Sequence, residues 1–276
     1  MVGSVRKPMR RSKKIGTADQ GFKRRKAFGI PSPDHGEHRF YERLVNPVEI
    51  KQTLGEHEFT VLIEPPFDGF HYYLSVSDLI EVLKLIPHAD RKDVEVIAFR
   101  QPKRKERIFS AVWGRMAYWA EFGKHEGVAV VIEAIEDDYR YKVGTSIGPM
   151  HTRELAALEA DGHNIVCDGK AIHIVTTSDA IRRTQLFRTL LHEIGHHVDY
   201  EQKVTRPSDA GEGNWLELRD LYFTRPKRER EHFADRYAAE VLASVRQHGV
   251  VPFGPKPNDP AWGLDPAWFY FAREHD

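Results

Sequence analysis

The chain has 276 residues and a mass of 31.9 kDa, and 41% of its residues are hydrophobic, enough for one sizeable core. Its 41 basic and 41 acidic residues cancel, so the whole chain has no electrostatic bias toward nucleic acid or anionic membranes. A single cysteine, Cys167, excludes an internal disulfide and a cysteine-based zinc cluster. No apolar run of about 18 residues is present, and no apolar stretch follows the basic N-terminus. We therefore expect a soluble, cytoplasmic protein with no membrane partner.

The first 28 residues are strongly basic. They hold ten Lys and Arg residues and one acidic residue, Asp19, which gives this segment a charge of +9. Such a run is typical of a solvated, disordered tail over 1–28. The alternative is an arm that binds nucleic acid or an acidic partner, although the chain shows no recognisable nucleic-acid-binding module. After it we expect an N-terminal extension over 29–76, a main domain over 77–247 and an irregular C-terminal tail over 248–276.

The extension and the start of the main domain show strand and helix signals in turn. Residues 59–64 have the composition of a strand, 65–69 contain the Pro and Gly of a turn, and 70–74 are expected to complete a hairpin. A short helix is predicted next. Its apolar residues recur at helical spacing, Ser77 is its expected cap, and Pro87 stops it.

Several strands are predicted in the middle of the chain. Residues 94–99 are β-branched and apolar, and 108–119 are aromatic with a bulge or turn expected at Gly114. The most hydrophobic segment, 127–133, is the best candidate for a central strand. Residues 164–175 read as a tight hairpin with Asp-Gly at its turn.

Two long helices complete the pattern and predict an α+β fold. The first is expected over 179–200 with Ser178 as its cap, and the second over 226–249, where a glycine is a suitable C-terminal stop. Between them, 203–215 contains Pro and Gly and is expected to be a loop.

The first long helix carries a metal-binding pattern. His192 and His196 are four residues apart, so on a helix they project from one face and can bind one metal ion. Glu193 is offset by about 100° and is expected to lie beside the open position of the metal as a general base. The alternative is a pair of histidines buried in a core.

A tetrahedral zinc site needs a third protein ligand and leaves one position for water. The extended metzincin pattern is excluded because Asp199 and Gln202 stand where it requires Gly and His. On the second long helix, Glu231 and Asp235 share a face. Glu231 could ligate the metal, while Asp235 could bind the outer nitrogen of a metal-binding histidine. His232 is the alternative third ligand, although it points off that face.

These residues resemble the gluzincin zinc metallopeptidases, in which two histidines and one downstream glutamate hold the metal. The finer pattern of 192–199 followed by 231–237 is most similar to the catalytic domain of the anthrax lethal-factor-like peptidases. That resemblance implies a zincin-like mixed β-sheet, a bound Zn²⁺ ion and a protein or peptide substrate. It also implies an oxyanion-stabilising tyrosine upstream of the ligand glutamate. Tyr222 stands nine residues before Glu231, and its alternative role is aromatic packing.

A second family also fits. The residues over 231–238 are similar to the ImmA/IrrE peptidases, regulatory enzymes that cleave repressors. Both resemblances cover about 77–247 and imply that zinc activates a water molecule whose proton Glu193 accepts. By analogy with such folds, the strand over 171–176 is expected to lie along the cleft and pair with the substrate. A rival hypothesis is a non-catalytic zinc-binding regulatory protein whose basic arm binds nucleic acid.

Overall fold

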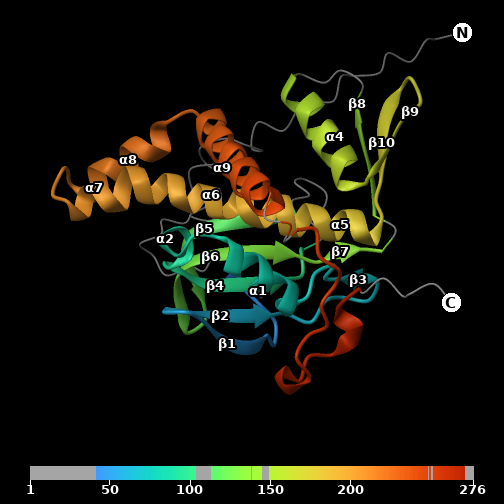
Figure 1. Cartoon of the computed structure of the whole chain (residues 1–276), viewed down its shortest axis with the longest axis horizontal. Helices are drawn as coiled ribbons and strands as arrows, with labels where there is room; N and C mark the ends of the chain where they lie inside the picture. The colour runs from blue at the N-terminus through green and yellow to red at the C-terminus, as the bar shows by residue number, and fades with distance from the viewer. Residues whose placement is uncertain are drawn as a thin grey trace, which may run out of the picture. The chain divides into compact units, whose positions relative to one another are not determined.

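The computed structural model describes residues 42–103, 113–137, 139–144, 149–247, 249 and 251–270. The chain divides into two compact units, residues 1–39 and 40–276, and every described residue belongs to the second. The basic tail predicted over 1–28 therefore lies outside the described residues, as does the beginning of the strand predicted over 108–119. The fold of the second unit is α+β with a mixed β-sheet, as predicted (Figure 1).

A five-stranded sheet in the order β1-β2-β4-β6-β5 forms the centre of this fold. β2, β4 and β6 run parallel to one another, whereas β1 and β5 are antiparallel edge strands. The strands are β1 (Val48–Leu54), β2 (His57–Ile63), β4 (Val94–Arg100), β5 (Gly114–Phe122) and β6 (His125–Glu133). The strands predicted over 59–64, 94–99 and 127–133 are confirmed, and β4 is buried on six of its seven residues, as expected for a covered parallel strand.

The hairpin predicted between 59–64 and 70–74 is wrong. Both edges of β2 are already occupied, because β1 pairs with one side and β4 with the other. Pro65 and Pro66 follow β2 and have no N–H groups with which to continue a ladder. The chain instead forms the two-residue strand β3 (Phe70–His71), which pairs with β7 (Ile135–Glu136).

The irregularity expected at Gly114 lies further along the strand. Gly114 begins β5, and a Cβ at this position would lie 2.7 Å from the carbonyl oxygen of Val131 and 2.8 Å from Cγ2 of Thr189. The glycine therefore permits a close approach of β5 to its neighbours. The bulge itself lies between Ala117 and Ala120. β1 was not predicted, because only one of its seven residues is buried and its apolar signal is weak.

The helix predicted from Ser77 to the stop at Pro87 is α1 (Val76–Leu85). Its cap is Ser75 rather than Ser77. The Ser75 hydroxyl accepts a hydrogen bond from the Asp78 backbone N–H at 2.8 Å, and the Asp78 carboxylate accepts one from the Ser75 backbone N–H at 3.2 Å. This reciprocal pair is a capping box, and it places the Asp78 side chain in the protein interior. The one-turn helix α2 (His88–Arg91) follows.

The helix predicted over 179–200 is confirmed, but the helical run is longer. It comprises α5 (Ser178–Thr184), the π-helical segment η4 (Gln185–Thr189), α6 (Leu190–Tyr200), the π-helical segment η5 (Glu201–Thr205) and α7 (Arg206–Asp209). Thr177 caps it in place of Ser178. The first half of the loop predicted over 203–215 is therefore helical, because Pro207 falls in the first turn of α7, where its missing N–H is tolerated.

The second long helix is also confirmed, as α9 (Lys227–Gln247), and Gly249 follows it with a φ of 67°. The sequence analysis did not predict α4 (Pro149–Asp161) or α8 (Trp215–Thr224), and α8 buries only Tyr222. The hairpin predicted over 164–175 is confirmed as β9 (Asn164–Cys167) and β10 (Ala171–Val175). An unpredicted strand, β8 (Arg140–Gly144), pairs with the other side of β10.

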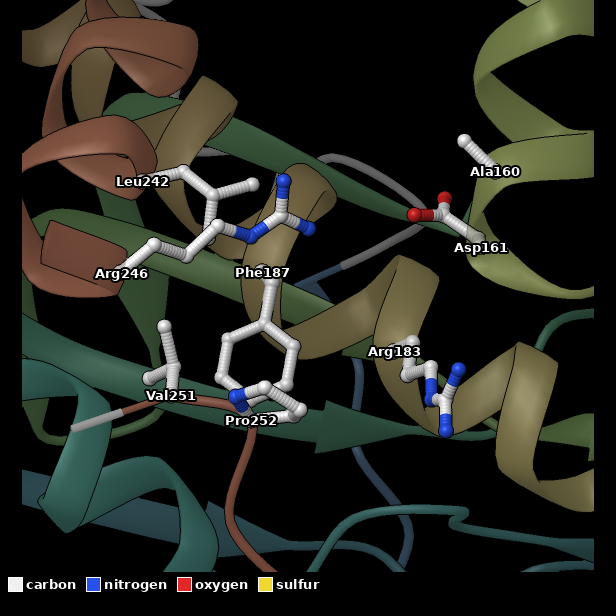
Figure 2. A pocket seen from close by; sticks show the side chains of 8 residues that line it. All are labelled: Ala160, Asp161, Arg183, Phe187, Leu242, Arg246, Val251 and Pro252. Atoms are coloured by element: carbon white, nitrogen blue, oxygen red, sulfur yellow. The ribbon is translucent and has the colours of Figure 1, made fainter. Parts of the chain in front are cut away.

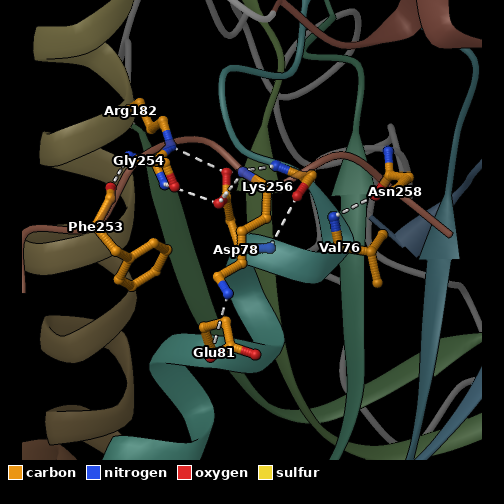
Figure 3. A network of polar contacts seen from close by, with 9 residues as sticks. Val76, Asp78, Glu81, Arg182, Phe253, Gly254, Lys256 and Asn258 are labelled. Atoms are coloured by element: carbon orange, nitrogen blue, oxygen red, sulfur yellow. Dashed lines mark hydrogen bonds and ion pairs between the residues drawn. The ribbon is translucent and has the colours of Figure 1, made fainter. Parts of the chain in front are cut away.

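The C-terminal segment over 251–270 is irregular, as predicted, apart from two 3₁₀ turns, η6 (Pro260–Trp262) and η7 (Pro266–Trp268). A polar network fastens it to α1 and α5 (Figure 3). Arg182 of α5 donates to both carboxylate oxygens of Asp78, at 3.0 and 2.7 Å, and to the carbonyl oxygens of Phe253 and Gly254. The backbone N–H of Lys256 donates to Asp78 at 2.9 Å.

One hydrophobic core joins the sheet to α1, η4, α6, α9 and the C-terminal segment. Residues 48–63, which we expected in an N-terminal extension, supply β1 and β2 of the central sheet. Among the described residues, no helix is long and apolar enough to cross a membrane.

Candidate metal centre

Helices α6 and α9 pack against each other (Figure 1), and they approach closely at Gly195. A Cβ on Gly195 would lie 2.9 Å from Cα and 3.0 Å from the carbonyl oxygen of Ala234. Real Cβ atoms essentially never approach backbone atoms so closely, so only glycine permits this spacing. The contact brings the first turn of α9 next to the histidine-bearing face of α6.

The predicted metal ligands converge at this contact. Oε2 of Glu231 lies 3.3 Å from Nε2 of His192 and 3.6 Å from Nε2 of His196. The two imidazole planes are nearly perpendicular, at 88°. We refer to these three residues as the histidine cluster. Ligand atoms that each lie about 2.1 Å from one tetrahedral centre are about 3.4 Å apart, so this donor set fits a zinc ion.

Asp235 contacts the outer nitrogen of His192, as predicted. Its Oδ1 lies 2.9 Å from Nδ1 of the imidazole. Nδ1 donates to this carboxylate, and the protonated ring donates from Nε2 to Glu231; a metal ion bound at Nε2 would take the place of that second proton and leave the first on Nδ1. Burial alone would lower the pKa of His192, but its contacts with Asp235 and Glu231 outweigh burial and raise the pKa to about 10. The same histidines hold the pKa of the Glu231 carboxyl well below its ordinary value. The site therefore favours a positive charge between these groups.

Glu193 lies on the same helix but outside the histidine cluster. Its carboxylate accepts a hydrogen bond from the backbone N–H of Met116 on β5. Burial raises the pKa of Glu193, and the charges of His192 and His196 only partly offset that effect. A carboxylate with a raised pKa beside a metal-ligand set can accept and return a proton near neutral pH.

Tyr222, the predicted oxyanion-stabilising residue, is buried beside the end of α6. It is 1% exposed, and its hydroxyl lies 3.2 Å from the hydroxyl of Tyr118 and hydrogen-bonds Asp199. Burial, together with these two neighbours, raises the pKa of Tyr222 far above its ordinary value. It packs in an aromatic cluster with Tyr118, Tyr200 and Phe223. These contacts agree with the packing alternative for Tyr222, and its role toward an oxyanion stays a prediction.

Asp199 has a larger structural role than the sequence indicated. It is fully buried and lies 2.6 Å from Nζ of Lys203 and 3.0 Å from Nη1 of Arg225. It therefore anchors the segment before α9 to the end of α6. His232, the alternative third ligand, is exposed and stands outside the histidine cluster. Lys203 lies four residues later on the same helical run, but Arg225 is brought to Asp199 by the tertiary fold, so no local pattern shows that Asp199 is buried.

The strand expected to line the cleft cannot pair with a substrate. β10 is the middle strand of the sheet β8-β10-β9, so both of its edges carry ladder hydrogen bonds. The strand beside α6 is β5, which lies at the edge of the central sheet as far as the described residues show. The N–H of Met116 that reaches Glu193 also belongs to β5. The edge strand next to the histidine cluster is therefore β5.

A small cavity lies apart from this site (Figure 2). Its volume is about 50 Å³, and α4, α5, η4, α9 and the C-terminal segment line it. Asp161 and Arg183 reach it from one side and Arg246 from the other, while Phe187 lies between them. A cavity of this size holds a few water molecules at most. No member of the histidine cluster lines it.

In comparisons with known proteins, no protein-family model, curated protein or solved structure matches this chain.

Gly195→Ala is expected to damage the metal centre without altering any ligand. The added methyl group would force α6 away from Ala234, separating the two histidines from Glu231. Overpacking of this kind costs about 1–3 kcal/mol of stability. Titration calorimetry with Zn²⁺ should show a dissociation constant raised at least about tenfold, because ligand geometry is disturbed. Unchanged zinc affinity in a folded variant would mean that this contact does not position the ligands. Ala239→Ser, an exposed change on α9, is the matched control.

Proposed function

We propose that the protein is a zinc-dependent metallopeptidase of the gluzincin kind, in which a zincin-like sheet supports a catalytic helix. The observation that carries the proposal is the histidine cluster itself. His192, His196 and Glu231 are brought together from two helices, with Asp235 on the outer nitrogen of His192 and Glu193 beside them. A structural zinc site has no need of the additional carboxylate, whereas a hydrolase needs one as a general base.

The chain's own residues account for the remaining parts of peptide hydrolysis. A zinc ion held by the histidine cluster would act as a Lewis acid and lower the pKa of a bound water toward about 7. Glu193 accepts the proton of the attacking water and returns it to the leaving amine. Asp235 holds the ring of His192 in the tautomer that leaves Nε2 free to bind the metal.

The substrate is proposed to be a protein or peptide that binds in an extended conformation. β5 is an edge strand beside α6, and an edge offers backbone N–H and C=O groups that an extended peptide can pair with. The side chains of the histidine cluster keep 14–32% of their surface exposed, so we propose that a peptide laid along β5 reaches it. Main-chain pairing of this kind positions a scissile bond without depending on one side chain.

Zinc analysis of purified variants tests the proposal. Glu231→Ala is expected to lose one zinc ion per chain relative to the wild type, because two imidazoles alone bind zinc weakly. Glu193→Gln should keep the wild-type zinc content, because Glu193 is not a ligand in this arrangement. Glu240→Gln removes an exposed carboxylate of the same helix as Glu231 and is the control. Equal zinc content in Glu231→Ala and the wild type would refute the three-ligand site.

A further inference from the structure

We propose that Asp93, His197 and Glu201 form a second binding site for a divalent transition-metal cation. We call this group the Asp93 cluster. One ligand atom from each of these three side chains lies within 4.8 Å of the others. His197 follows His196 on α6 and projects about 100° around the helix from it, so the two groups open in different directions. The inference stands whether or not the protein is a peptidase.

The decisive observation is the state of the His197 side chain. It is 1% exposed, and neither of its ring nitrogens has a hydrogen-bond partner. A neutral imidazole has one donor and one acceptor, and leaving a buried polar group unpaired costs about 1–3 kcal/mol. Buried polar groups without partners are uncommon in folded proteins and indicate a missing water, ion or ligand. Here the two nearest candidate partners are both carboxylates.

One helical run and one turn bring this group together. Asp93 lies in the turn between α2 and β4, His197 lies in α6, and Glu201 begins η5 one turn later. α2 packs against α6, which places the turn beside the helix. A cation bound here would tie the catalytic helix to the turn that leads into β4. It would therefore fix the position of α6 relative to that turn.

None of the described charged side chains around the Asp93 cluster bonds the ring of His197. Nζ of Lys92 lies 3.8 Å from Oδ2 of Asp93, at the outer limit of an ion pair, and both side chains are more than 40% exposed. Thr205 hydrogen-bonds Glu201, and Arg206 and Asp90 lie near His197 without bonding it. None of these groups satisfies the imidazole.

The donor set selects the class of metal. One imidazole nitrogen with two carboxylate oxygens suits zinc, cobalt or nickel, with a water molecule completing the shell. Calcium and magnesium prefer oxygen donors throughout, so a histidine at the centre of the site disfavours them. We therefore commit to zinc as the probe.

The test is zinc stoichiometry on the full chain after chelator treatment, reconstitution and desalting. The wild type is expected to hold two zinc ions. Asp93→Asn/Glu201→Gln should hold one, Glu231→Ala should hold one, and the combined variant none. Asp209→Asn removes one exposed acidic charge shortly after the cluster and should keep two. Thermal unfolding confirms that each variant is folded.

The outcomes separate this inference from the proposed function. One zinc in both the wild type and Asp93→Asn/Glu201→Gln would overturn the second site and leave the peptidase proposal intact. One zinc that Asp93→Asn/Glu201→Gln loses and Glu231→Ala keeps would support the second site and overturn the peptidase proposal. No zinc in the reconstituted wild type would overturn both.

A spectroscopic readout covers the case in which the double variant does not fold. Cobalt added to Glu231→Ala should give visible d–d absorption that saturates at one equivalent. The single change Asp93→Asn, at a side chain that is 43% exposed, should weaken that binding at least about tenfold. Equal cobalt binding with and without Asp93→Asn would overturn the inference.

Discussion

Glu193→Gln is expected to reduce peptide hydrolysis by about 10²–10⁴-fold, the usual contribution of a general base. Gln retains the size of the side chain and can still accept the hydrogen bond from the N–H of Met116, so the local geometry should persist. It cannot take a proton from water. The loss should therefore appear in kcat, with little change in KM or in zinc content.

The measurement requires a substrate mixture, because the sequence specificity is not defined by the site. Wild-type protein is incubated with a diverse library of unfolded peptides, and new termini are identified by mass spectrometry. Cleavage rates of the peptides found are then compared for the wild type, Glu193→Gln and Glu240→Gln, which changes an exposed residue of α9. Full cleavage by zinc-loaded Glu193→Gln would exclude Glu193 as the general base.

Asp78→Asn is expected to destabilise the fold by about 3–5 kcal/mol, the cost of removing one partner of a buried ion pair. The change leaves the guanidinium of Arg182, whose side chain is only 8% exposed, without its countercharge (Figure 3). It also weakens the hydrogen bond from the Lys256 backbone that holds the C-terminal segment. Urea denaturation should show a lower midpoint.

Two controls separate the ion pair from general sensitivity to substitution. Glu81→Gln, on the same helix as Asp78, removes the surface ion pairs with Lys84 and Lys256 and should cost less than about 1 kcal/mol. Asp78→Leu combined with Arg182→Met removes both charges and should recover much of the stability that either single change loses. If either single variant, Asp78→Leu or Arg182→Met, were as stable as the wild type, the ion pair would not stabilise the contact between α1 and α5.

Local patterns predicted the parts of the site that depend on one helix. The spacing of His192 and His196 and the shared face of Glu231 and Asp235 follow from the period of the α-helix, and both pairs appear in the structure as expected. Tyr222 stands nine residues before Glu231. In the structure it lies on the buried face of α8, and its hydroxyl contacts Tyr118. No local pattern contains that information.

The positions of strands were likewise predicted from local patterns, whereas their pairing partners were not. β2 and β10 were located correctly, because their apolar, β-branched residues and the adjacent turn residues are visible in the sequence. Their partners were not, because β2 pairs in parallel with β4, more than thirty residues later, and β10 gains β8 from before α4. The edge of the sheet follows from the complete set of pairings, and so β5, not β10, lies beside α6. An edge strand can be predicted only when the pairing partners of every strand in the sheet are known.

The fastening of the C-terminal segment to α1 has a consequence for the order in which the protein matures on the ribosome. Hydrogen bonds join Lys256 to Asp78 and Asn258 to Val76, across about 180 residues of chain. A nascent chain that ends before residue 251 already contains the histidine cluster. It does not yet contain the carbonyl oxygens of Phe253 and Gly254, to which Arg182 donates hydrogen bonds. Contacts of such long range form late in folding. The packing beneath α6 is therefore completed only after translation has passed the histidine cluster.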